Sequence, residues 1–411
     1  MKKIFTILVT FCVYNAGAQP LTPEITSWII NTNGSTGYGN YPSNVQQVQY
    51  STDSVFVSCS CIPGYDIGPW TGNPNVPANQ NFCFRITRHP QQNTGNPVNT
   101  PLGHIGVWSN GVSIFNAKDA MSYGGNGVWN QNALYFEGTS FDDCLGHPAP
   151  NGEYHHHVNP TCLYDDSNAI VHSPIIGYAF DGFPIYGAYG FANANGTGGI
   201  KRMESSYRMR NISDRTTLPD GTVLTAPDYG PAIGGMYALG AYIEDFDFDS
   251  TYGDLDEHNG RVCVTPDYPS GTYAYFVTID SLLNPVFPYT LGLTYYGIVP
   301  GGNIGPGSGH NVPVAAVVTY NPTGVTDVFS SFDITAYPNP ATDFISVNFS
   351  SSDFSSKQCQ LYDETGAMIY QTDFTTEREI KIPMQNFSEG IYLVKISSAG
   401  GSVFSSRILK Q

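Results

Sequence analysis

The chain has 411 residues, of which 12% are charged, and it contains 44 Gly, 29 Pro and 28 Tyr. This composition favours many short strands joined by turns, and the length suits two or three domains. Acidic residues outnumber basic ones, 34 to 17, and the resulting net charge of -17 disfavours nucleic acid and anionic membrane surfaces as partners.

The chain begins with the features of a secretory signal peptide. Lys2 and Lys3 precede an apolar stretch of about ten residues from Ile4 to Val13, and small residues follow at positions 16–18. A membrane-spanning helix needs about twenty apolar residues, so a permanent anchor is the weaker interpretation. We therefore expect residues 1–18 to be removed between Ala18 and Gln19. We expect no integral membrane span in the mature protein.

The main body runs from residue 19 to residue 322, with its core at about residues 100–300. Its strand-like segments are rich in β-branched or aromatic residues and are bounded by turn-forming residues. They are Ser54–Ser58, Asn81–Thr87, Gly106–Ile114, Tyr273–Ile279 and Val312–Thr319. Helical periodicity is weak, and only Ala117–Ser122 is expected to form a short helical turn. The body is therefore expected to be a large, loop-rich β domain.

Seven cysteines remain after the signal peptide, and export implies an oxidising compartment in which disulfides persist. Cys144 and Cys162 flank a single loop and are the first expected pair. Cys83 with Cys59 or Cys61 is the next. The odd count leaves at least one cysteine outside such pairs, and no C-x-x-C motif occurs to indicate a redox or zinc-ribbon site.

Four of the nine histidines fall within eleven residues. His147 precedes a turn, and three consecutive histidines follow it. If Tyr154–Val158 is a strand, His155 and His157 project from one face about 7 Å apart, and their imidazoles can lean onto one ion. Imidazole suits transition metals rather than calcium or magnesium. The pattern predicts a transition-metal site, with zinc or copper as the expected ion.

Such a site needs at least a third ligand. His147 is the nearest candidate, because the chain can return to it across the turn at residues 148–152. The other candidates are more distant in sequence or are acidic: Asp142, Asp143, His104, His172 and His258. The two aspartates could instead orient an imidazole N–H. His156 should point away from the pair and is expected at the surface.

Two other interpretations of the histidine cluster stay open. Histidines beside tyrosines and carboxylates can form a buried hydrogen-bond network that holds a loop in place. A histidine can also act as a general acid or base without a metal.

The region around the histidines has an echo later in the chain. Residues 141–147 parallel residues 255–261, and residues 152–157 parallel residues 271–276. Each copy has an acidic pair, a glycine turn and a G-x-Y that begins a strand, but Ala274 and Phe276 replace the H-x-H pair in the second copy. A duplicated unit is the simplest account, with the first copy functional and the second a scaffold. The alternative is a chance similarity over few positions.

These residues resemble the YHYH domain family, named for its Tyr-His-Tyr-His motif. Further matching segments are 105–107, 111–116, 172–179, 181–187 and 271–278. His156 replaces the third motif residue, a tyrosine, whereas both family histidines, His155 and His157, are present. The family has no settled biochemical role, so the resemblance implies a domain identity and no mechanism.

The character of the chain changes after a linker at residues 323–333. Residues 334–411 alternate polar and apolar positions and contain four expected strands, which predicts a compact antiparallel, immunoglobulin-like β-sandwich. They are Phe344–Phe349, Cys359–Tyr362, Met368–Thr372 and Glu379–Ile382. The Tyr-Pro-Asn-Pro opening, the GIYLVKI strand and the basic tip at Arg407 and Lys410 resemble the type A C-terminal sorting domain of the type IX secretion system.

This second resemblance implies that the type IX machinery carries the protein across the outer membrane, to be released or held at the cell surface. An immunoglobulin-like module without a targeting role is the alternative.

Three hypotheses for the function of the mature protein follow. The first is a secreted or surface-displayed protein that binds a transition metal through His155, His157 and a third ligand. The second is a metal-dependent extracellular hydrolase or oxidase, with Glu153 or Asp143 as a nearby base. The third is a binding or adhesion protein whose tyrosines contact a surface glycan and whose histidines are structural.

Overall fold

The computed structural model describes residues 21–305, 307–313, 316–322, 334–349, 357–363, 366–374, 379–398 and 403–411. The expected signal peptide and its cleavage site, and the expected linker, lie outside these residues. The chain forms two compact units, residues 1–320 and 321–411. In the part of the chain that the structure describes, no helix has the length and apolar composition needed to cross a membrane.

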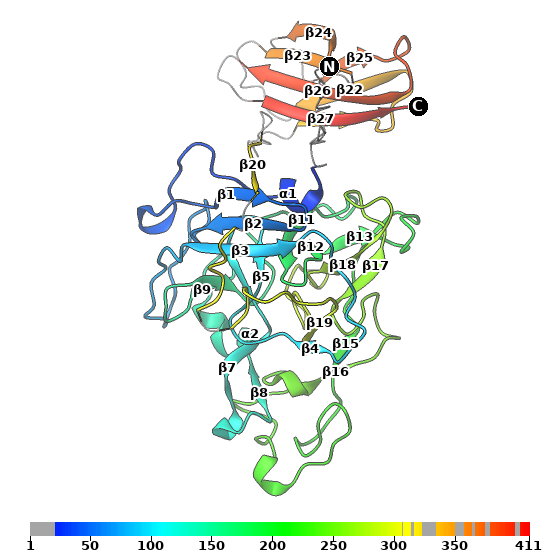
Figure 1. Ribbon diagram of the computed structural model, residues 1–411. Coiled ribbons are helices and arrows are strands. Elements are labelled where there is room, and N and C mark those ends of the chain that lie inside the picture. The colour runs from blue at the N-terminus through cyan, green and yellow to red at the C-terminus, as the bar shows by residue number, and fades with distance from the viewer. Residues whose placement is uncertain are drawn as a thin grey trace, which may run out of the picture. The chain divides into compact units, whose positions relative to one another are not determined.

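The first unit consists of short strands joined by long loops (Figure 1). They are β1 (Val45–Tyr50), β2 (Ser54–Cys59), β3 (Phe82–Thr87), β4 (Val98–Asn99), β5 (His104–Trp108), β6 (Ser113–Phe115), β7 (Lys118–Ser122), β8 (Asn130–Asn132), β9 (Gly146–Pro148), β10 (Tyr154–His156), β11 (Ile175–Ala179), β12 (Pro184–Tyr186), β13 (Tyr189–Phe191), β14 (Ile200–Arg202), β15 (Tyr207–Met209), β16 (Phe246–Phe248), β17 (Gly260–Cys263), β18 (Thr272–Phe276), β19 (Thr294–Tyr295) and β20 (Val318–Tyr320). The described helices are α1 (Pro23–Thr26), α2 (Ala133–Glu137) and five single turns of 3-10 helix, at Tyr38–Asn40, Tyr123–Gly125, Gly138–Ser140, Ala226–Asp228 and Ile243–Asp245.

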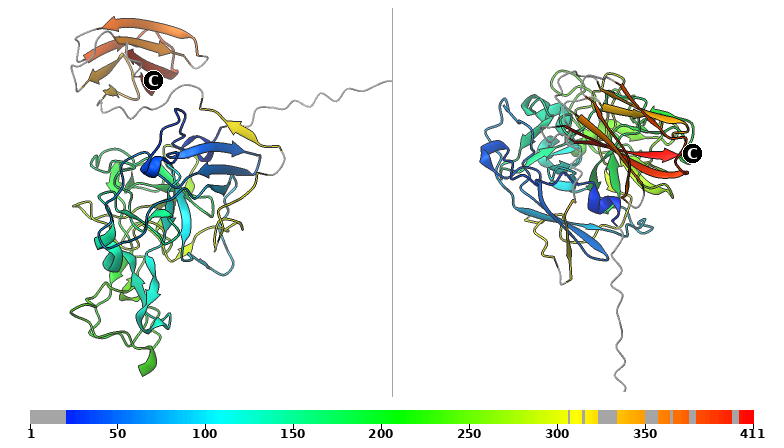
Figure 2. Two further views of the ribbon diagram at one scale, coloured as in Figure 1. Left: turned by 90° about the vertical axis from the view of Figure 1, so that its left-hand side faces the viewer. Right: turned by 90° about the horizontal axis from the view of Figure 1, so that it is seen from above.

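Two sheets organise this unit. One has four strands in the order β20-β1-β2-β3, and the other has eight in the order β17-β18-β12-β11-β5-β6-β10-β9. Figures 1 and 2 show β7, β8 and the green loops around residues 210–240 at the end of the unit opposite β1 and β2. That end has a small aromatic cluster of its own around Trp129 and Tyr242.

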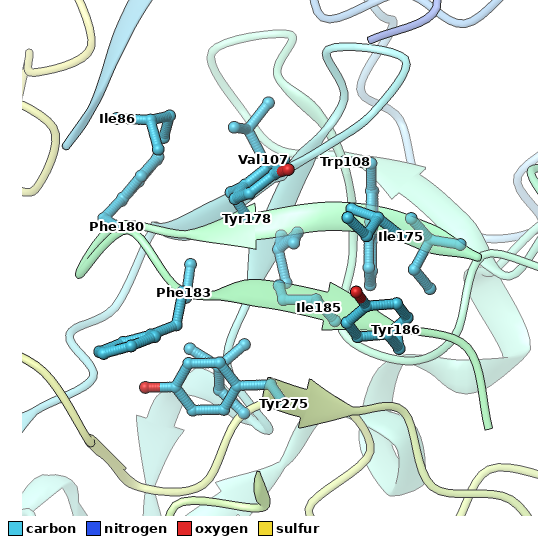
Figure 3. Packing of buried hydrophobic residues seen from close by; sticks show 14 of the residues in the cluster. Ile86, Val107, Trp108, Ile175, Tyr178, Phe180, Phe183, Ile185, Tyr186 and Tyr275 are labelled. Carbon is cyan, nitrogen blue, oxygen red and sulfur yellow. The ribbon is translucent and has the colours of Figure 1, made fainter. Parts of the chain in front are cut away.

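The main core lies along the middle of the eight-stranded sheet. Figure 3 shows Val107, Tyr178, Ile185 and Tyr275 gathered there from four neighbouring strands, β5, β11, β12 and β18. All four side chains are fully buried, and removal of such aromatic and branched surface from water is the main stabilising contribution. A rigid sheet therefore supports the strands at both of its edges.

The large sheet shows the same arrangement of strands, in pairing direction and in chain order, when it is followed inward from either edge. Neighbouring strands are antiparallel except for β6 with β10 and β12 with β18, which are parallel and occupy matching places. The halves are β5-β6-β10-β9 and β11-β12-β18-β17, and they meet where β5 pairs with β11. The unit therefore contains two copies of one four-stranded arrangement.

Several strand predictions need correction. The expected strand Gly106–Ile114 is the β5–β6 hairpin, because Asn110-Gly111 forms its turn, with Gly111 at a φ of 82°. The expected helical turn at Ala117–Ser122 is strand β7, which pairs with β8. Of the expected strand Val312–Thr319, the end becomes β20, and the other residues of this range that the structure describes form no strand.

The second unit is a sandwich of two antiparallel sheets. Its strands are β21 (Ile334–Tyr337), β22 (Phe344–Phe349), β23 (Lys357–Tyr362), β24 (Met368–Phe374), β25 (Glu379–Pro383), β26 (Gly390–Ser398) and β27 (Val403–Lys410). One sheet has the order β21-β22-β25, and the other has the order β24-β23-β26-β27. Alternate residues of both sheets, such as Val347 and Leu361, meet in one core. The mainly β class and the four strands predicted here are confirmed.

Candidate metal centre

The register of the large sheet places three histidines side by side at one of its edges. β10 pairs with β9 so that His155 lies opposite His147, and His157 follows β10 on the same face as His155. The Nε2 atoms of His147 and His155 are 3.1 Å apart, and those of His155 and His157 are 3.2 Å apart. All three residues are buried, at 5%, 3% and 3% exposed. The structure thus brings together the three residues that the sequence singled out.

Backbone and side-chain acceptors fix the other nitrogen of each ring. His155 Nδ1 lies 3.0 Å from the carbonyl oxygen of Glu153, and His157 Nδ1 lies 2.6 Å from that of Asn116. A carbonyl oxygen only accepts, so both Nδ1 atoms carry a proton that they donate. The proton of each neutral ring is therefore on Nδ1, and its lone pair is on Nε2.

The same reasoning holds for His147. Its Nδ1 lies 2.8 Å from the Ser140 hydroxyl, which donates its own proton to the Glu137 carbonyl oxygen at 2.7 Å. The hydroxyl must therefore accept from His147 Nδ1–H. Three Nε2 lone pairs consequently point into one small space.

At neutral pH the three imidazoles are not protonated, so the repulsion between their facing Nε2 lone pairs remains. Burial lowers the pKa of His147 to about 3, with help from the neighbouring His157, and burial lowers the pKa of His157 to about 4. Burial, followed by His147 and His157, also holds the pKa of His155 well below its usual value. Neutral imidazoles with facing lone pairs repel each other, whereas a bound cation would attract all three.

Glu137 lies beside two of the three histidines. Its Oε2 lies 3.3 Å from His157 Nε2 and 3.8 Å from His147 Nε2, and it is buried without a hydrogen-bond partner among the described residues. Burial, followed by the charge of Asp119, raises the pKa of Glu137 to about 7. A proton on this carboxyl could satisfy only one of the three lone pairs.

Sequence reasoning missed Glu137. It is the last residue of α2, ten positions before His147, and no motif marks it. Asn132 begins this short helix by accepting from Leu134 N, and the Ser140 hydroxyl accepts from His147 while donating to the carbonyl oxygen of Glu137. The side chain reaches the histidines because α2 packs against β7 and β8 while the following turn bonds to His147 of β9, which only the fold shows.

The four donors form part of the wall of a pocket of about 460 Å³. Strand β7, helix α2 with the turn that follows it, the 71–75 loop, the turn after β9, residues 102–103 and Phe115 of β6 supply the rest of the lining. Because the histidines and Glu137 all border this space, an ion held among them would have one side facing the pocket.

The remaining candidates lie outside the cluster. Asp143 is exposed, and His172 Nδ1 bonds to the Ser173 carbonyl oxygen. His104 lies between the Glu153 carboxylate and the Ser308 hydroxyl, at 2.9 Å from each. Glu153 is therefore engaged and does not line the pocket, which leaves it badly placed as a base there. His258 bonds to Thr294, also away from the cluster.

His156 points away from the histidine pair, as expected, but the prediction of a surface position is wrong. The ring is fully buried against Tyr154 and Trp108, and neither ring nitrogen has a hydrogen-bond partner among the described residues. Burial lowers the pKa of His156 to about 3. The reason is that β10 is an inner strand of the sheet, covered on both faces.

Two features hold in place the chain segment that carries the histidine cluster. The expected disulfide between Cys144 and Cys162 is present. Asp142 accepts from the Tyr154 hydroxyl at 2.9 Å and from the Cys144 and Gly146 amides at 3.0 Å each, so it fixes the loop and touches no imidazole. 

The prediction that Cys83 pairs with Cys59 or Cys61 is wrong, because all three are free thiols. Cys59 lies opposite Phe82 and Cys83 lies opposite Ser58, so the two thiols point to different faces of the sheet.

The duplicated unit predicted from the sequence is confirmed at atomic detail. Tyr154 donates to Asp142 in the first copy, and Tyr273 donates to Asp256 at 2.8 Å in the second. The strand registers also agree, because His156 lies opposite Ile114 as Tyr275 lies opposite Ile185.

In the second copy, the three histidine positions are occupied as follows: Arg261 for His147, Ala274 for His155 and Phe276 for His157. The Arg261 guanidinium lies over the Phe276 ring, 5.7 Å from its centre. These residues cannot form a comparable set of nitrogen donors, so the cluster belongs to the first copy alone.

The fold and the site define the class of protein: a β protein with an internally duplicated domain, one half of which carries a buried three-histidine cluster, and a separate C-terminal β-sandwich. Residues 83–287, which include the whole cluster, match the model of the YHYH protein family. Residues 335–411 match the secretion system C-terminal sorting domain.

The chain therefore carries a YHYH domain followed by a type IX sorting domain, and it is a secreted or cell-surface protein.

Other comparisons add little. No curated protein matches the chain. A solved structure from Bacteroides vulgatus ATCC 8482, described as a duf3244 family protein with an immunoglobulin-like β-sandwich fold, is 18% identical. It covers 19% of this chain and 84% of its own, with a TM-score of 0.18.

Proposed function

We propose that this secreted or cell-surface protein binds a transition-metal ion, zinc or copper, through His147, His155 and His157, with Glu137 as a fourth donor. The observation that carries the proposal is the convergence of three Nε2 lone pairs whose Nδ1 atoms are all committed as donors. A purely structural histidine network would place a proton between neighbouring rings, and here the acceptors on Nδ1 leave none available.

The spacing of the donors supports an ion of this kind. Zinc–nitrogen bonds of about 2.0–2.1 Å in a tetrahedron separate the donor atoms by roughly 3.3 Å. The distances of 3.1, 3.2 and 3.3 Å are close to that value, and the distance of 3.8 Å between Glu137 Oε2 and His147 Nε2 is somewhat longer. Imidazole nitrogens with one carboxylate also suit zinc and copper better than calcium or magnesium.

The test is the metal content of the full mature protein, produced without a histidine tag and measured for each element. Asparagine can donate from its amide at the place of histidine Nδ1, so the double variant His155→Asn with His157→Asn removes the ligand nitrogens and keeps the backbone hydrogen bonds. His172→Asn is the matched control. We expect roughly one ion per wild-type and control chain and none in the double variant. Equal metal content in all three, or none in the wild type after rebinding, would contradict the proposal.

A second candidate function is a metal-dependent extracellular enzyme, favoured by the pocket that adjoins the four donors. Bound zinc would supply an activated water for hydrolysis, and copper would supply redox chemistry. Hydrolysis of ester or peptide substrates, or oxidation of phenols, by metal-loaded wild type but not by His155→Asn would support it. Equal rates in both proteins would exclude the metal site as the source.

A further inference from the structure

The pocket beside the histidine cluster is lined by both charged and apolar side chains. Lys118 and Asp119 of β7 line it together with Glu137, and Leu102, Phe115 and Phe136 contribute apolar surface. With about 460 Å³ it is large enough for an organic molecule and larger than an inorganic anion requires.

The charges in this pocket favour an anion once a metal is bound. Glu137 would be neutralised as a ligand, and the charges of a divalent ion and Lys118 together exceed those of Glu137 and Asp119. Among the described residues the Lys118 ammonium group makes no hydrogen bond or ion pair, although its charge acts on the Glu244 carboxyl, which does not line the pocket. Lys201, in contrast, is paired with Asp254 at 2.9 Å. The chain as a whole is strongly acidic, so local positive charge here would direct an anion to this pocket.

The apolar walls indicate what the anion is attached to. Phe115 stacks on His155, with ring centres 3.8 Å apart, so the apolar wall begins directly beside the donors. Leu102 is 53% exposed, so part of the apolar wall is open to solvent at the rim. A molecule whose charged head reaches the metal would therefore lay its apolar part along these side chains.

We propose that the pocket binds a small organic acid whose carboxylate coordinates the metal on its open side and pairs with Lys118, while its apolar body contacts Phe115, Phe136 and Leu102. The proposal rests on the metal site proposed above. Zinc can accept such a fifth ligand, and copper(II) also accommodates one.

The test uses the full mature chain loaded with cobalt(II), whose visible absorption reports ligand number and ligand exchange. Phenylacetate is the probe, acetate tests the apolar contribution, and phenylacetamide is the neutral analogue. We expect phenylacetate to change the cobalt spectrum at lower concentration than acetate, and phenylacetamide to have no effect. Metal-free protein should not bind phenylacetate.

The variant Lys118→Met separates the roles. It should retain the cobalt spectrum, which also shows that the site is folded, and bind phenylacetate about tenfold or more weakly. Lys201→Met is the matched loss of charge and should bind as the wild type does. A cobalt spectrum that does not respond to phenylacetate, or an equal response to phenylacetamide, overturns the carboxylate site alone. A chain that shows no cobalt spectrum overturns the metal site and this proposal together.

Discussion

Replacement of His155 by asparagine should abolish stabilisation by metal while leaving the metal-free protein nearly unchanged. Asparagine can still donate to the Glu153 carbonyl oxygen, so the hydrogen bond at 3.0 Å is kept. The variant loses the ring that stacks on Phe115 at 3.8 Å, which costs about 1 kcal/mol, and it also removes two contacts between facing lone pairs. The metal-free variant should therefore lie within about 1 kcal/mol of the wild type.

The effect of metal is larger. Free zinc at a hundred times its dissociation constant stabilises a folded protein by about 2.7 kcal/mol. For a unit of this size, that corresponds to a rise in Tm of about 4 °C. The wild type and His172→Asn should show this rise, and His155→Asn should not.

Tryptophan fluorescence during unfolding is a suitable assay. All four tryptophans lie in the first unit, so the signal follows that unit and is not mixed with unfolding of the C-terminal sandwich. If zinc stabilises His155→Asn as much as the wild type, the convergence of the Nε2 atoms does not bind metal and the reasoning fails.

Three further predictions concern the surroundings of the site. Replacing Cys144 and Cys162 by serine should lower the free energy of unfolding in urea by about 3 kcal/mol, because the disulfide closes a loop of 18 residues in the unfolded chain. A loss below about 0.5 kcal/mol would contradict this. Tyr154→Phe and Tyr273→Phe should each cost roughly 1–3 kcal/mol, because the first leaves the buried Asp142 and the second the half-buried Asp256 short of one donor. Similar values would show that the two copies are energetically equivalent. His157 has a folded pKa of about 4, below its unfolded value, so the unfolded chain takes up the proton first as the pH falls. The free energy of unfolding of the metal-free protein should therefore decrease below about pH 6.5, and this group should account for roughly 2 kcal/mol of the loss at pH 5. The His157→Asn variant should lose less stability over the same pH range, as measured by urea unfolding.

The amino-acid sequence alone determined the features that depend on local order. The alternation of apolar residues in 334–411 identified the C-terminal sandwich and four of its strands, because a half-buried strand imposes a period of two. The spacing of His155 and His157 likewise placed both on one face. The pair Cys144 and Cys162 was found because one short loop joins them.

Errors arose where burial and pairing depended on distant segments. His156 was expected at the surface, but strands on both sides and Trp108 cover it. The pattern over Gly106–Ile114 predicts one strand because its apolar residues continue on both sides of the turn at Asn110-Gly111. Whether Cys59 faces Cys83 depends on the β2–β3 register, which a single sequence does not reveal.

The sequence by itself thus determined the two-part organisation, the β class and the histidines that form the cluster. Only the tertiary structure decided that His147 lies opposite His155, that Glu137 joins them from α2, and that a pocket opens beside them. The physical reason is that ligand geometry depends on where separate strands and a helix pack against one sheet. Strand register and packing arise from contacts between segments distant in the chain, and these leave no periodic signal within any one of them.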